Sequence, residues 1–584
     1  MIVQPRLTSL LTLAGLSLCA TQAHAAHAPL ASMASYASLA PTVTVDSGIN
    51  ADERQRARDI LRAIREQRWS DVDQMLAVAQ RDLLAPLLTA EYFLAANSPE
   101  VPLERLMALL RQAPDLPQAA QLARLAQRRG ATELPPMPIE ASLRWSGSSP
   151  IRARAKSVTD DPVGVELGKI VQPLITNDDP AGAERALTEV TDRLSPAART
   201  EWQQRVAWSY YIENRDADAL RMARLAQQGE GDWRVHGDWI AALAAWRLND
   251  CRYAAASFDK VMNGTSDTEL KAAGAYWASR AYLACGEPHL VQSRLRTAAG
   301  QRETFYGFLA MEALGLPEPS PALAETSGRG VAAKSNVRMA AALAEMGEHR
   351  LADELLRHQA KIGPASDHDE LLAVARSLNL AETQLYLAHN TPGGKRPDEF
   401  ARYPAPDWKP ESGWRVDPAL VYAHTLQESG FRRDVVSSAG AYGLMQVRPG
   451  TAQDLAKVRG SFLEKSDLAR PEVNIEYGQS YLEKLRDSSV TGGLLPKVIA
   501  AYNAGPSPVA RWNGEVNDKG DPLLYIESLP YWETRGYVAI ILRNYWMYER
   551  QEGRGSVTQN VLAQNHWPRF PDARSGTRLS LNEQ

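Results

Sequence analysis

Residues 241–261, AALAAWRLNDCRYAAASFDKV, contain the pattern that decides the fold. Two alanine-rich apolar segments, Ala241–Leu248 and Tyr253–Val261, flank the short polar turn Asn249-Asp250-Cys251. Apolar segments on both sides of a polar turn indicate two helices that pack against each other as a hairpin. Further turns of this kind lie at Glu66-Gln67-Arg68, Glu213-Asn214-Arg215, Cys285-Gly286-Glu287 and Met346-Gly347-Glu348. The sequence therefore predicts a chain made largely of helical hairpins.

The spacing of the hairpins predicts how they are arranged. Asn214 and Asn249 are 35 residues apart, and Asn249 and Gly286 are 37 residues apart. This period is close to that of tetratricopeptide-like arrays, in which each hairpin buries its apolar face on the next. We therefore expect residues 51–297 to form an α-superhelical solenoid or ring. Large aromatic side chains at helical spacing ordinarily belong to the core, so we expect packing between helices for Trp202, Trp208, Trp233, Trp239, Trp246 and Trp277.

Composition excludes several classes of protein. Of the 584 residues, 44% are hydrophobic and 23% are charged, which fits neither global disorder nor a polytopic membrane protein. Lys and Arg number 65 against 69 Asp and Glu, a formal net charge of −4. This balance argues against a protein that binds nucleic acid through bulk positive charge. Strand-forming runs are scarce, so we expect a mainly α fold.

The first 25 residues have the three parts of a secretory signal peptide. Arg6 precedes a mostly apolar run from Leu7 to Cys19, and Ala23-His24-Ala25 forms a small-x-small cleavage pattern. The run is too short to span a bilayer comfortably, and no later stretch has about 18 uninterrupted apolar residues. We therefore expect cleavage of residues 1–25, a flexible leader over residues 26–50, and a mature protein that is soluble in the periplasm.

Cleavage would leave two cysteines, Cys251 and Cys285, each at a predicted turn between helices. In an oxidising compartment they could form one disulfide, whereas two free buried thiols fit the sequence equally well. The sequence contains no CxxC motif and no Cys/His cluster with metal-ligand spacing. We therefore expect neither a metal nor a cofactor.

Two breaks interrupt the helical pattern. Residues 133–161 contain Pro-Pro, Ser-Gly-Ser-Ser-Pro and a basic run, which predict an extended connection. Residues 391–415 contain five prolines and three glycines, which cannot continue a helix. We therefore expect residues 391–415 to connect two domains, with a separate domain over residues 416–584.

The segment after the second break suggests an acid with an unusual pKa. Asp417 at the N-cap, Pro418 at the first helical position and Gly430 beyond the end predict a helix of about three turns. Glu428 falls in its last turn, where the helix dipole disfavours a negative charge, and apolar neighbours such as Leu426 would desolvate it. Both effects raise the pKa of Glu428, which suits proton delivery near neutral pH. For this segment alone, a surface glutamate near the helix end is the competing interpretation.

Four motifs follow one another in this domain: Gln427-Glu428-Ser429-x-Phe431, Gly440-Ala441-x-Gly443-Leu444-Met445-Gln446, Ala501-Tyr502-Asn503-Ala504-Gly505 and Glu533-Thr534-Arg535-x-Tyr537-Val538. Their order resembles that of the soluble lytic murein transglycosylases of the large periplasmic type. This resemblance implies a ring of helical hairpins joined to a lysozyme-like α+β catalytic domain over residues 416–584. The stretch Phe305-Tyr306-Gly307-Phe308-Leu309-Ala310 is similar to the start of the family's linker domain, which implies a helical linker domain over residues 298–390.

The resemblance also implies roles for individual residues. Glu428 aligns with the family's single catalytic acid and base, and Tyr502 with a tyrosine whose hydroxyl reaches the reaction centre. Glu533 corresponds to a glutamate that contacts the product-side sugar or its peptide. The other substrate-binding residues implied by the motifs are Ser437, Met445, Gln446 and Asn503. At Arg448 the chain departs from the pattern, because relatives commonly carry methionine there.

The distribution of acidic residues fits a site with one carboxylate. Retaining and inverting glycosidases ordinarily use a second carboxylate at a fixed separation from the first. Between Glu428 and Asp454 the sequence has only Asp434, and no acid occupies the Gly440–Val447 run. The resemblance implies that Glu428 protonates the glycosidic oxygen between N-acetylmuramic acid and N-acetylglucosamine. The 6-hydroxyl of the muramyl residue then closes on C1 and gives a 1,6-anhydro end without consuming water.

Two alternatives remain open at this point: a hydrolytic muramidase that uses water, and a non-catalytic helical-repeat scaffold that only binds peptidoglycan. A zinc hydrolase is disfavoured because the sequence has no HExxH pair, and His424 is better explained by packing or hydrogen bonding. The expected partner is the peptidoglycan glycan strand, with cell-wall synthases or other hydrolases as further candidates. We expect a monomer with no nucleic-acid partner.

Overall fold

The computed structural model describes residues 43, 45–317, 329–396 and 398–571. Within these ranges the chain forms 27 α-helices, four short 3-10 helices and two short strands, which confirms the mainly α fold class. The predicted signal peptide and most of the predicted leader lie outside the described residues. None of the helices in the described ranges has the length and apolar character needed to cross a membrane.

The predicted hairpin turns are confirmed, and they share one backbone feature. Each turn contains one residue in the left-handed region, with φ of 58° at Gln67, 56° at Asn214, 61° at Asn249, 74° at Gly286 and 81° at Gly347. Helices commonly end in such a residue, which glycine and asparagine adopt most easily. The Asn and Gly residues at four of the five turns are therefore the local reason that each helix stops and reverses.

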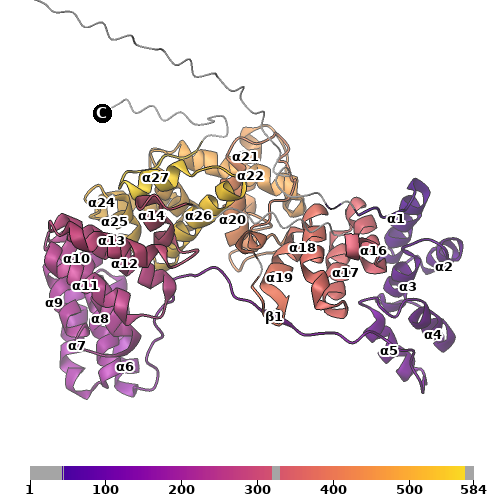
Figure 1. The fold of residues 1–584 in the computed structure, drawn as a ribbon, viewed down its shortest axis with the longest axis horizontal. Helices are drawn as coiled ribbons and strands as arrows, with labels where there is room; N and C mark the ends of the chain where they lie inside the picture. The colour runs from indigo at the N-terminus through magenta and orange to yellow at the C-terminus, as the bar shows by residue number, and fades with distance from the viewer. Residues whose placement is uncertain (1–42, 44, 318–328, 397, 572–584) are drawn as a thin grey trace, which may run out of the picture.

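The first helical unit combines two segments that are far apart in sequence. Its helices share a core distinct from that of the rest of the chain, and Figure 1 shows them at one end of the molecule. The unit contains α1 (Ala51–Arg65), α2 (Trp69–Val78), α3 (Ala85–Leu94), α4 (Leu103–Gln112), α5 (Ala119–Arg128), α15 (Arg329–Ala332), α16 (Ser335–Glu345), α17 (His349–Ile362), η2 (Ala365–Asp367), α18 (His368–Ser377) and α19 (Ala381–His389). The expected single superhelix over residues 51–297 therefore differs from the structure, because α1–α5 pack with α15–α19.

The end of the expected flexible leader also belongs to this unit. Val43, Val45 and Ile49 are buried in its core, and the Ser47 hydroxyl donates a hydrogen bond to Glu345 Oε1 at 3.1 Å. The expectation of flexibility is therefore wrong for residue 43 and residues 45–50. The Ser47 carbonyl also accepts a hydrogen bond from Arg338 of α16 at 3.1 Å, and the low charge of the segment did not indicate these contacts.

The second helical unit is an arc of consecutive hairpins at the opposite end of the molecule (Figure 1). Neighbouring helices along the chain pack on one another, most extensively α11 on α12. Cys251 and Cys285 form a disulfide that links two successive turns, with Cα atoms 5.6 Å apart, which settles the alternative left open by the sequence. The arc contains α6 (Pro162–Thr176), α7 (Pro180–Val190), η1 (Thr191–Arg193), α8 (Pro196–Ile212), α9 (Asp216–Ala226), α10 (Gly231–Arg247), α11 (Cys251–Gly264), α12 (Thr268–Ala284), α13 (Pro288–Ala299) and α14 (Phe305–Ala313).

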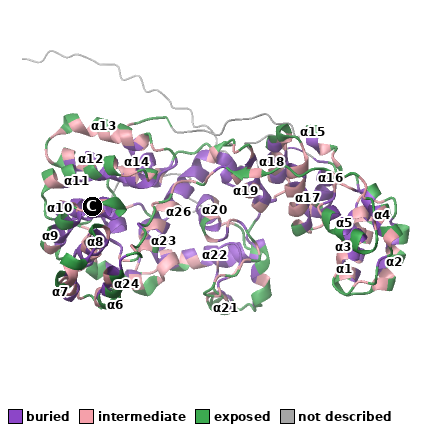
Figure 2. Cartoon of the chain, turned by 90° about the horizontal axis from the view of Figure 1, so that it is seen from below, coloured by how far each residue is buried: buried purple, intermediate pink, exposed green. Residues whose placement is uncertain are grey.

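The C-terminal domain lies between the two helical units in Figure 1. Its core is continuous with that of the arc, and α14 packs on both α26 and α27. The expected domain boundary near residue 298 is therefore not a boundary between cores. The domain contains α20 (Pro418–Ser429), α21 (Pro449–Val458), η4 (Lys465–Ala469), α22 (Pro471–Arg486), α23 (Leu495–Ala504), α24 (Pro506–Glu515), α25 (Pro522–Ser528), α26 (Trp532–Gln551) and α27 (Val557–Ala563). Figure 2 shows that α20 and α22 are largely buried in the middle of the molecule.

Extended segments connect the two helical units and the C-terminal domain. Within the segment 133–161, strand β1 (Leu143–Trp145) pairs antiparallel with β2 (Asn390–Pro392), so that Arg144 lies opposite Thr391. Farther along this segment, Arg152 donates two hydrogen bonds to Glu527, at 2.7 and 2.9 Å. The predicted extended connection thus runs from the first helical unit, past the C-terminal domain, to the helical arc, where Asp161 caps α6.

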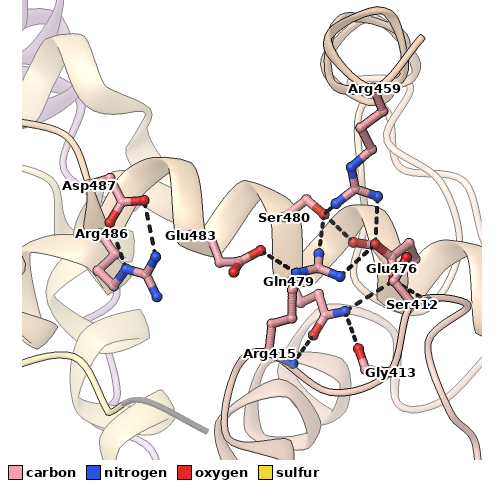
Figure 3. Close-up of polar contacts among 10 residues, drawn as sticks. All are labelled: Ser412, Gly413, Arg415, Arg459, Glu476, Gln479, Ser480, Glu483, Arg486 and Asp487. Atoms are coloured by element: carbon pink, nitrogen blue, oxygen red, sulfur yellow. Dashed lines mark hydrogen bonds and ion pairs between the residues drawn. The ribbon is translucent and has the colours of Figure 1, made fainter. Parts of the chain in front are cut away.

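The connecting segment before α20 is fastened to α22 by a polar cluster (Figure 3). The connecting segment follows the 3-10 helix η3 (Glu399–Arg402). The Arg415 guanidinium donates to Glu476 at 2.9 Å and to Glu483 at 2.9 Å, and the Ser412 N–H donates to Glu476 at 3.1 Å. Arg459, after the end of α21, donates to the same Glu476 carboxylate at 2.5 Å. This cluster fixes where α20 begins, and therefore where Glu428 lies.

Candidate active site

The helix that carries Glu428 has the caps that the sequence predicts. The Asp417 carboxylate accepts a hydrogen bond from the Ala419 N–H at 2.9 Å, and Pro418 occupies the first helical position. Gly430 ends the helix with φ of 59°, and Phe431 follows with φ of 64°. A bulky residue in the left-handed region is strained. Phe431 is held there by burial, with 1% of its surface exposed.

Glu428 is partly buried near the end of α20, and one neutral donor contacts it. The Tyr537 hydroxyl, from α26, lies 2.5 Å from Glu428 Oε1. Burial raises the pKa of Glu428 to about 7, the hydrogen bond from Tyr537 opposes this shift, and the charge of Glu533 adds to it. A carboxyl with this pKa is available in both protonation states near neutral pH, as a general acid that later acts as a base requires.

His424 extends this contact into a chain of three side chains. Its Nδ1 lies 2.9 Å from the Tyr537 hydroxyl, and burial lowers the pKa of His424 to about 3, so that the ring is neutral. Among the described residues, the buried Nε2 atom has no hydrogen-bond partner. A buried N–H without an acceptor is rarer than an unused acceptor. We therefore assign the proton to Nδ1, which leaves Tyr537 to donate to Glu428.

The loop that faces this helix is held by Asn474 of α22. Asn474 Oδ1 accepts from the Met445 N–H at 2.8 Å, while its Nδ2 donates to the carbonyls of Tyr442 and Leu468 at 2.9 and 2.8 Å. Gly443 adopts φ of 68°, and a Cβ atom there would lie 2.4 Å from Asn474 Nδ2. The glycine of the second motif is thus required by the close approach of the asparagine side chain.

The loop residues expected to bind substrate differ in how accessible they are. Ser437 and Gln446 are partly exposed. The Ser437 hydroxyl accepts from the Ala441 N–H at 3.0 Å, and the Gln446 side-chain amide donates to the Gly443 carbonyl at 2.8 Å. Met445 is fully buried, with its sulfur against Gly478. The side chain of Met445 is therefore not available to a ligand, and its backbone carbonyl accepts from the Tyr502 hydroxyl at 2.7 Å instead.

The remaining expected residues come from α23 and α26. The Tyr502 ring contacts that of His424, with centroids 4.6 Å apart. Burial and the nearby charge of Glu428 raise the pKa of Tyr502 well above its usual value, so its hydroxyl stays protonated.

Asn503 and Glu533 lie farther along the same part of the domain. Asn503 Oδ1 accepts from the Thr534 hydroxyl at 2.7 Å, and Glu533 is exposed. Asn503 and Glu533 border one cavity of about 800 Å³, and Gln427, Glu533 and Tyr537 border another of about 290 Å³.

Three residues contribute to the site besides those that the sequence predicts to act on or bind the substrate. Tyr537 was visible as part of the fourth motif, but its contact with Glu428 spans 109 positions and is a product of the fold. His424 was assigned to packing or hydrogen bonding, and the structure confirms that assignment. No sequence signal pointed to Asn474. Among the described residues, no group of His, Cys, Asp or Glu side chains is arranged to hold a metal ion.

Comparison with known proteins shows what the C-terminal domain is similar to. Residues 408–524 match the family described as Transglycosylase SLT domain. The soluble lytic murein transglycosylase of Escherichia coli K12 is 36% identical over 147 residues, which cover 25% of this chain and 21% of that protein. The match thus spans about a fifth of the length of this curated relative.

Solved structures extend the likeness beyond this domain. The crystal structure of the 70 kDa soluble lytic transglycosylase from Escherichia coli aligns with a TM-score of 0.55 at 18% identity and covers 89% of this chain and 99% of that one. An inactive glutamate-to-glutamine mutant of lytic transglycosylase Slt from Pseudomonas aeruginosa aligns with a TM-score of 0.50 at 19% identity, covering 87% and 90%. Residues 408–524 are therefore similar to the transglycosylase SLT domain, and the overall fold of the chain resembles that of these solved lytic transglycosylases.

Proposed function

We propose that this protein is a peptidoglycan lytic transglycosylase, a lyase that cleaves the β-1,4 bond between N-acetylmuramic acid and N-acetylglucosamine without water. The observation that carries the proposal is the partly buried Glu428, whose pKa is raised to about 7 and which contacts the Tyr537 hydroxyl at 2.5 Å. The family match at residues 408–524 and the curated transglycosylase relative support the same activity. The inactive glutamate-to-glutamine mutant known for a relative agrees with a single essential carboxyl.

The acidic residues near Glu428 favour a mechanism with one carboxylate. Within the described residues, Glu533 is the one acidic neighbour whose charge raises the pKa of Glu428. Glu533 is exposed and lies one helical turn before Tyr537 on α26. An exposed carboxylate at this place is suited to contact a sugar or peptide of the substrate, whereas a nucleophile would have to face the same sugar carbon as Glu428.

In the proposed reaction, protonated Glu428 gives its proton to the glycosidic oxygen, and the bond from that oxygen to C1 of the muramyl residue breaks. The muramyl N-acetyl group stabilises the positive charge at C1. The Glu428 carboxylate then takes the proton of the 6-hydroxyl of the same sugar while that oxygen bonds to C1. Tyr537 donates to Oε1 throughout, so Oε2 is the oxygen that exchanges the proton. The products are a 1,6-anhydromuramyl end and a free N-acetylglucosamine 4-hydroxyl.

We further propose that Ser437, Gln446, Tyr502, Asn503 and Glu533 bind the glycan. Ser437, Gln446 and Glu533 are not buried. Tyr502 contacts the His424 ring and is close enough to Glu428 for its charge to act on the Tyr502 hydroxyl. Asn503 borders the same cavity as Glu533. Met445 acts through its backbone, because its carbonyl fixes the Tyr502 hydroxyl. No metal or cofactor takes part in any of these steps.

The place of action that fits this substrate is the periplasm. The signal-peptide pattern of residues 1–25 and the disulfide between Cys251 and Cys285 support an exported protein. We propose a soluble monomer that acts in cell-wall turnover and meets cell-wall synthases or other hydrolases there.

The test is the chemistry of the product ends. The purified protein is incubated with murein, and the released muropeptides are analysed by mass spectrometry. We expect anhydro ends, which are lighter by one water than reducing ends. Reducing ends would establish the hydrolytic muramidase instead, and binding without any cleavage would establish the scaffold.

A further inference from the structure

A further cavity lies where the first helical unit meets the C-terminal domain. It has a volume of about 750 Å³, which is within the range of ligand sites. Residues of α17 line it from His349 to Lys361, at intervals of alternately one and three positions, so they share one face of the helix. At 1.5 Å per residue this face is about 18 Å long. The cavity is therefore elongated, and we call it the α17 groove.

The other walls of the α17 groove come from α19 and from the segment that follows α20. Tyr386 belongs to α19, and Phe431 and Arg433 follow the helix that carries Glu428. Figure 1 shows α17 and α19 beside α20. Among the described residues, none that lines the α17 groove also borders the two cavities that include Glu533. The groove is thus separate from the site around Glu428.

The charges in the α17 groove nearly cancel. Four Lys and Arg side chains and five Asp and Glu side chains line it. Three of the cations pair with carboxylates of the same groove: Arg357 with Glu382 at 2.9 Å, Arg350 with Glu354 at 3.5 Å and Lys361 with Glu140 at 3.6 Å. An anion would meet the carboxylates and a cation would meet the guanidinium groups, and such like-charge contacts are costly. The groove therefore favours a ligand that is polar but neutral.

Arg433 is the fourth cation, and its guanidinium lies over the Trp408 ring, with Cζ 4.9 Å from the centroid. In the described part of the chain it makes no hydrogen bond or ion pair. Asp353, Glu472 and Glu382 act on its charge without contacting it. Stacking on a ring occupies the face of a guanidinium and leaves the N–H groups at its edge, which need acceptors.

His349 is a second group at this end of the groove that lacks a partner. Its Nδ1 atom is buried and has no hydrogen-bond partner among the described residues. Burial, and after it the charge of nearby Arg433, lower the pKa of His349 to about 4, so the ring is neutral at neutral pH. A buried polar atom without a partner is costly. Arg433 and His349 together therefore mark a place where a ligand can supply missing hydrogen bonds.

We propose that the α17 groove binds a second stretch of glycan, a neutral chain of hydroxyl and acetamido groups, with Arg433 as the principal contact and His349 beside it. The inference rests on the proposed function, because that function brings a glycan strand to the protein. A hydroxyl group both donates and accepts hydrogen bonds. One chain can therefore bond to the carboxylate oxygens and to the guanidinium N–H groups of the groove, and can serve His349 Nδ1 in either tautomer.

Binding is measured first, in the Glu428→Gln protein, which is expected to be inactive. The probes are three hexamers of equal length: neutral N-acetylglucosamine, protonated glucosamine and anionic galacturonic acid. Hydrogen–deuterium exchange locates the binding of each probe. We expect the neutral hexamer to slow exchange in α17 and α19 at concentrations at which the charged hexamers do not. No protection of these helices by the neutral hexamer, or stronger protection by a charged one, would overturn the proposal.

Arg433→Gln, added to the same protein, is expected to weaken this protection about ten-fold, since a hydrogen bond to a charged group contributes at least that much. Arg224→Gln is the matched control, because Arg224 also lies over an aromatic ring, Tyr253 at 4.5 Å, but does not line the α17 groove. Circular dichroism and thermal unfolding check the fold of each variant. A folded Arg433→Gln variant with unchanged affinity for the neutral hexamer would contradict the proposal.

Arg357→Gln carries the test if Arg433→Gln fails to fold. Arg357 lines the groove, pairs with Glu382 and lies over the Tyr386 ring at 5.0 Å. Its matched control is Arg294→Gln, because Arg294 pairs with Asp259 at 2.8 Å and lies over the Tyr282 ring at 4.8 Å but does not line the groove. We expect about three-fold weaker binding of the neutral hexamer in Arg357→Gln alone. Equal binding by the two variants would overturn the proposal.

Kinetics on strands of two lengths separate a glycan site from a structural role. Arg433→Gln in the otherwise wild-type protein is expected to raise KM about ten-fold more on long murein strands than on the shortest strands that are cleaved. An equal rise on both lengths would overturn the proposal, since it would mean that Arg433 only supports the fold. Failure of the proposed function is distinguishable, because the wild type would then form no anhydro ends while the neutral hexamer would still protect α17 and α19.

Discussion

Two glutamates of the C-terminal domain, Glu428 on α20 and Glu476 on α22, are both shielded from water, yet their pKa values shift in opposite directions. Taken by itself, burial raises the pKa of both carboxyl groups. At Glu476 the Ser412 N–H and the guanidinium groups of Arg459 and Arg415 outweigh burial and lower the pKa. Among the described residues, the one hydrogen-bond donor to Glu428 is the neutral Tyr537 hydroxyl, and the neighbouring charge is that of Glu533.

The difference shows what makes a buried carboxyl a candidate acid. A carboxylate with cationic partners is ionised at all pH values of interest and serves as a structural anchor, as Figure 3 shows for Glu476. A carboxyl without them can hold and release a proton near neutral pH. The helix end and the apolar surroundings are therefore insufficient by themselves. Among the described residues, the lack of a cation beside the Glu428 carboxyl is what distinguishes it from Glu476.

The largest expected effect comes from removing the acid itself. Glu428→Gln should lower kcat on murein by about 10²–10⁴-fold or more, since general acid and base catalysis contributes about that much. The fold should be retained, because glutamine fills the same volume. The release of anhydromuropeptides and the thermal unfolding curve are the measurements. A folded variant that keeps a substantial part of the wild-type rate would contradict the assignment.

Glu428→Gln should also change how stability depends on pH. Because the pKa of Glu428 is raised in the folded state, its contribution to stability is complete below its unfolded pKa of about 4.3. This contribution is lost as the pH rises through about 7. Unfolding by urea at a series of pH values should therefore show a smaller decline between about pH 4 and 7 for the variant than for the wild type.

The second prediction applies the same substitution to the other glutamate. Glu476→Gln should lower the free energy of unfolding by about 2–4 kcal/mol, because Arg415 and Arg459 would keep their charges without a full partner. The activity of the folded fraction should change far less than in Glu428→Gln. Urea unfolding and specific activity are the measurements.

Glu483→Gln is the matched control for Glu476→Gln. It removes a more exposed partner of Arg415 from the same helix and should cost only about 0–1 kcal/mol. The pH dependence has the opposite sign to that of Glu428. The lowered pKa of Glu476 means that its contribution is present above the unfolded pKa and lost as the pH falls through the folded pKa. A loss of stability in Glu476→Gln no larger than in the control would refute the anchoring role.

A smaller effect is expected from the neutral donor at Glu428. Tyr537→Phe removes the hydrogen bond that opposes the raised pKa, so the pKa of Glu428 should rise by about one further unit, equivalent to about 1.4 kcal/mol. Because the protonated acid is the active form of the free enzyme, the alkaline limb of the kcat/KM profile should move to higher pH. A limb that stays in place, or moves to lower pH, would show that Tyr537 does not act on the acid.

The smallest effect is expected from His424, which acts on Glu428 only through Tyr537. His424→Leu removes the donor to the Tyr537 hydroxyl and should move the alkaline limb upward by a few tenths of a unit, since hydrogen bonds in a chain strengthen one another modestly. His424→Asn, which can offer an N–H at a similar place, should restore part of the shift. In the Tyr537→Phe background His424→Leu should have no effect on the limb. A shift of equal size in that background would exclude the proposed chain.

Local features of the fold could be predicted from the sequence. The hairpin turns follow from short polar stretches between apolar helices, and Asn214, Asn249 and Gly286 adopt the left-handed conformation that ends a helix. The caps of α20 follow equally from Asp417, Pro418 and Gly430. These features depend on neighbours within a few residues, which is why the sequence pattern is sufficient for them.

Which helices pack against one another could not be predicted in the same way. Helical periodicity identifies an apolar face but not the face that covers it. For that reason the association of α1–α5 with α15–α19, and the shared core of the arc and the C-terminal domain, differ from the expected division of the chain. The disulfide between Cys251 and Cys285 likewise depends on the stacking of successive hairpins.

The sequence by itself determined the helical architecture, the helix that carries Glu428 and the family motifs around it, because each of these depends on short-range pattern and residue type. The tertiary structure alone decided the electrostatics of the site. It placed Tyr537 and His424 beside one another near the acid, and it gave Glu476 two guanidinium groups. The physical reason is that a pKa depends on solvent and charges in three dimensions, and chain order does not specify either of them.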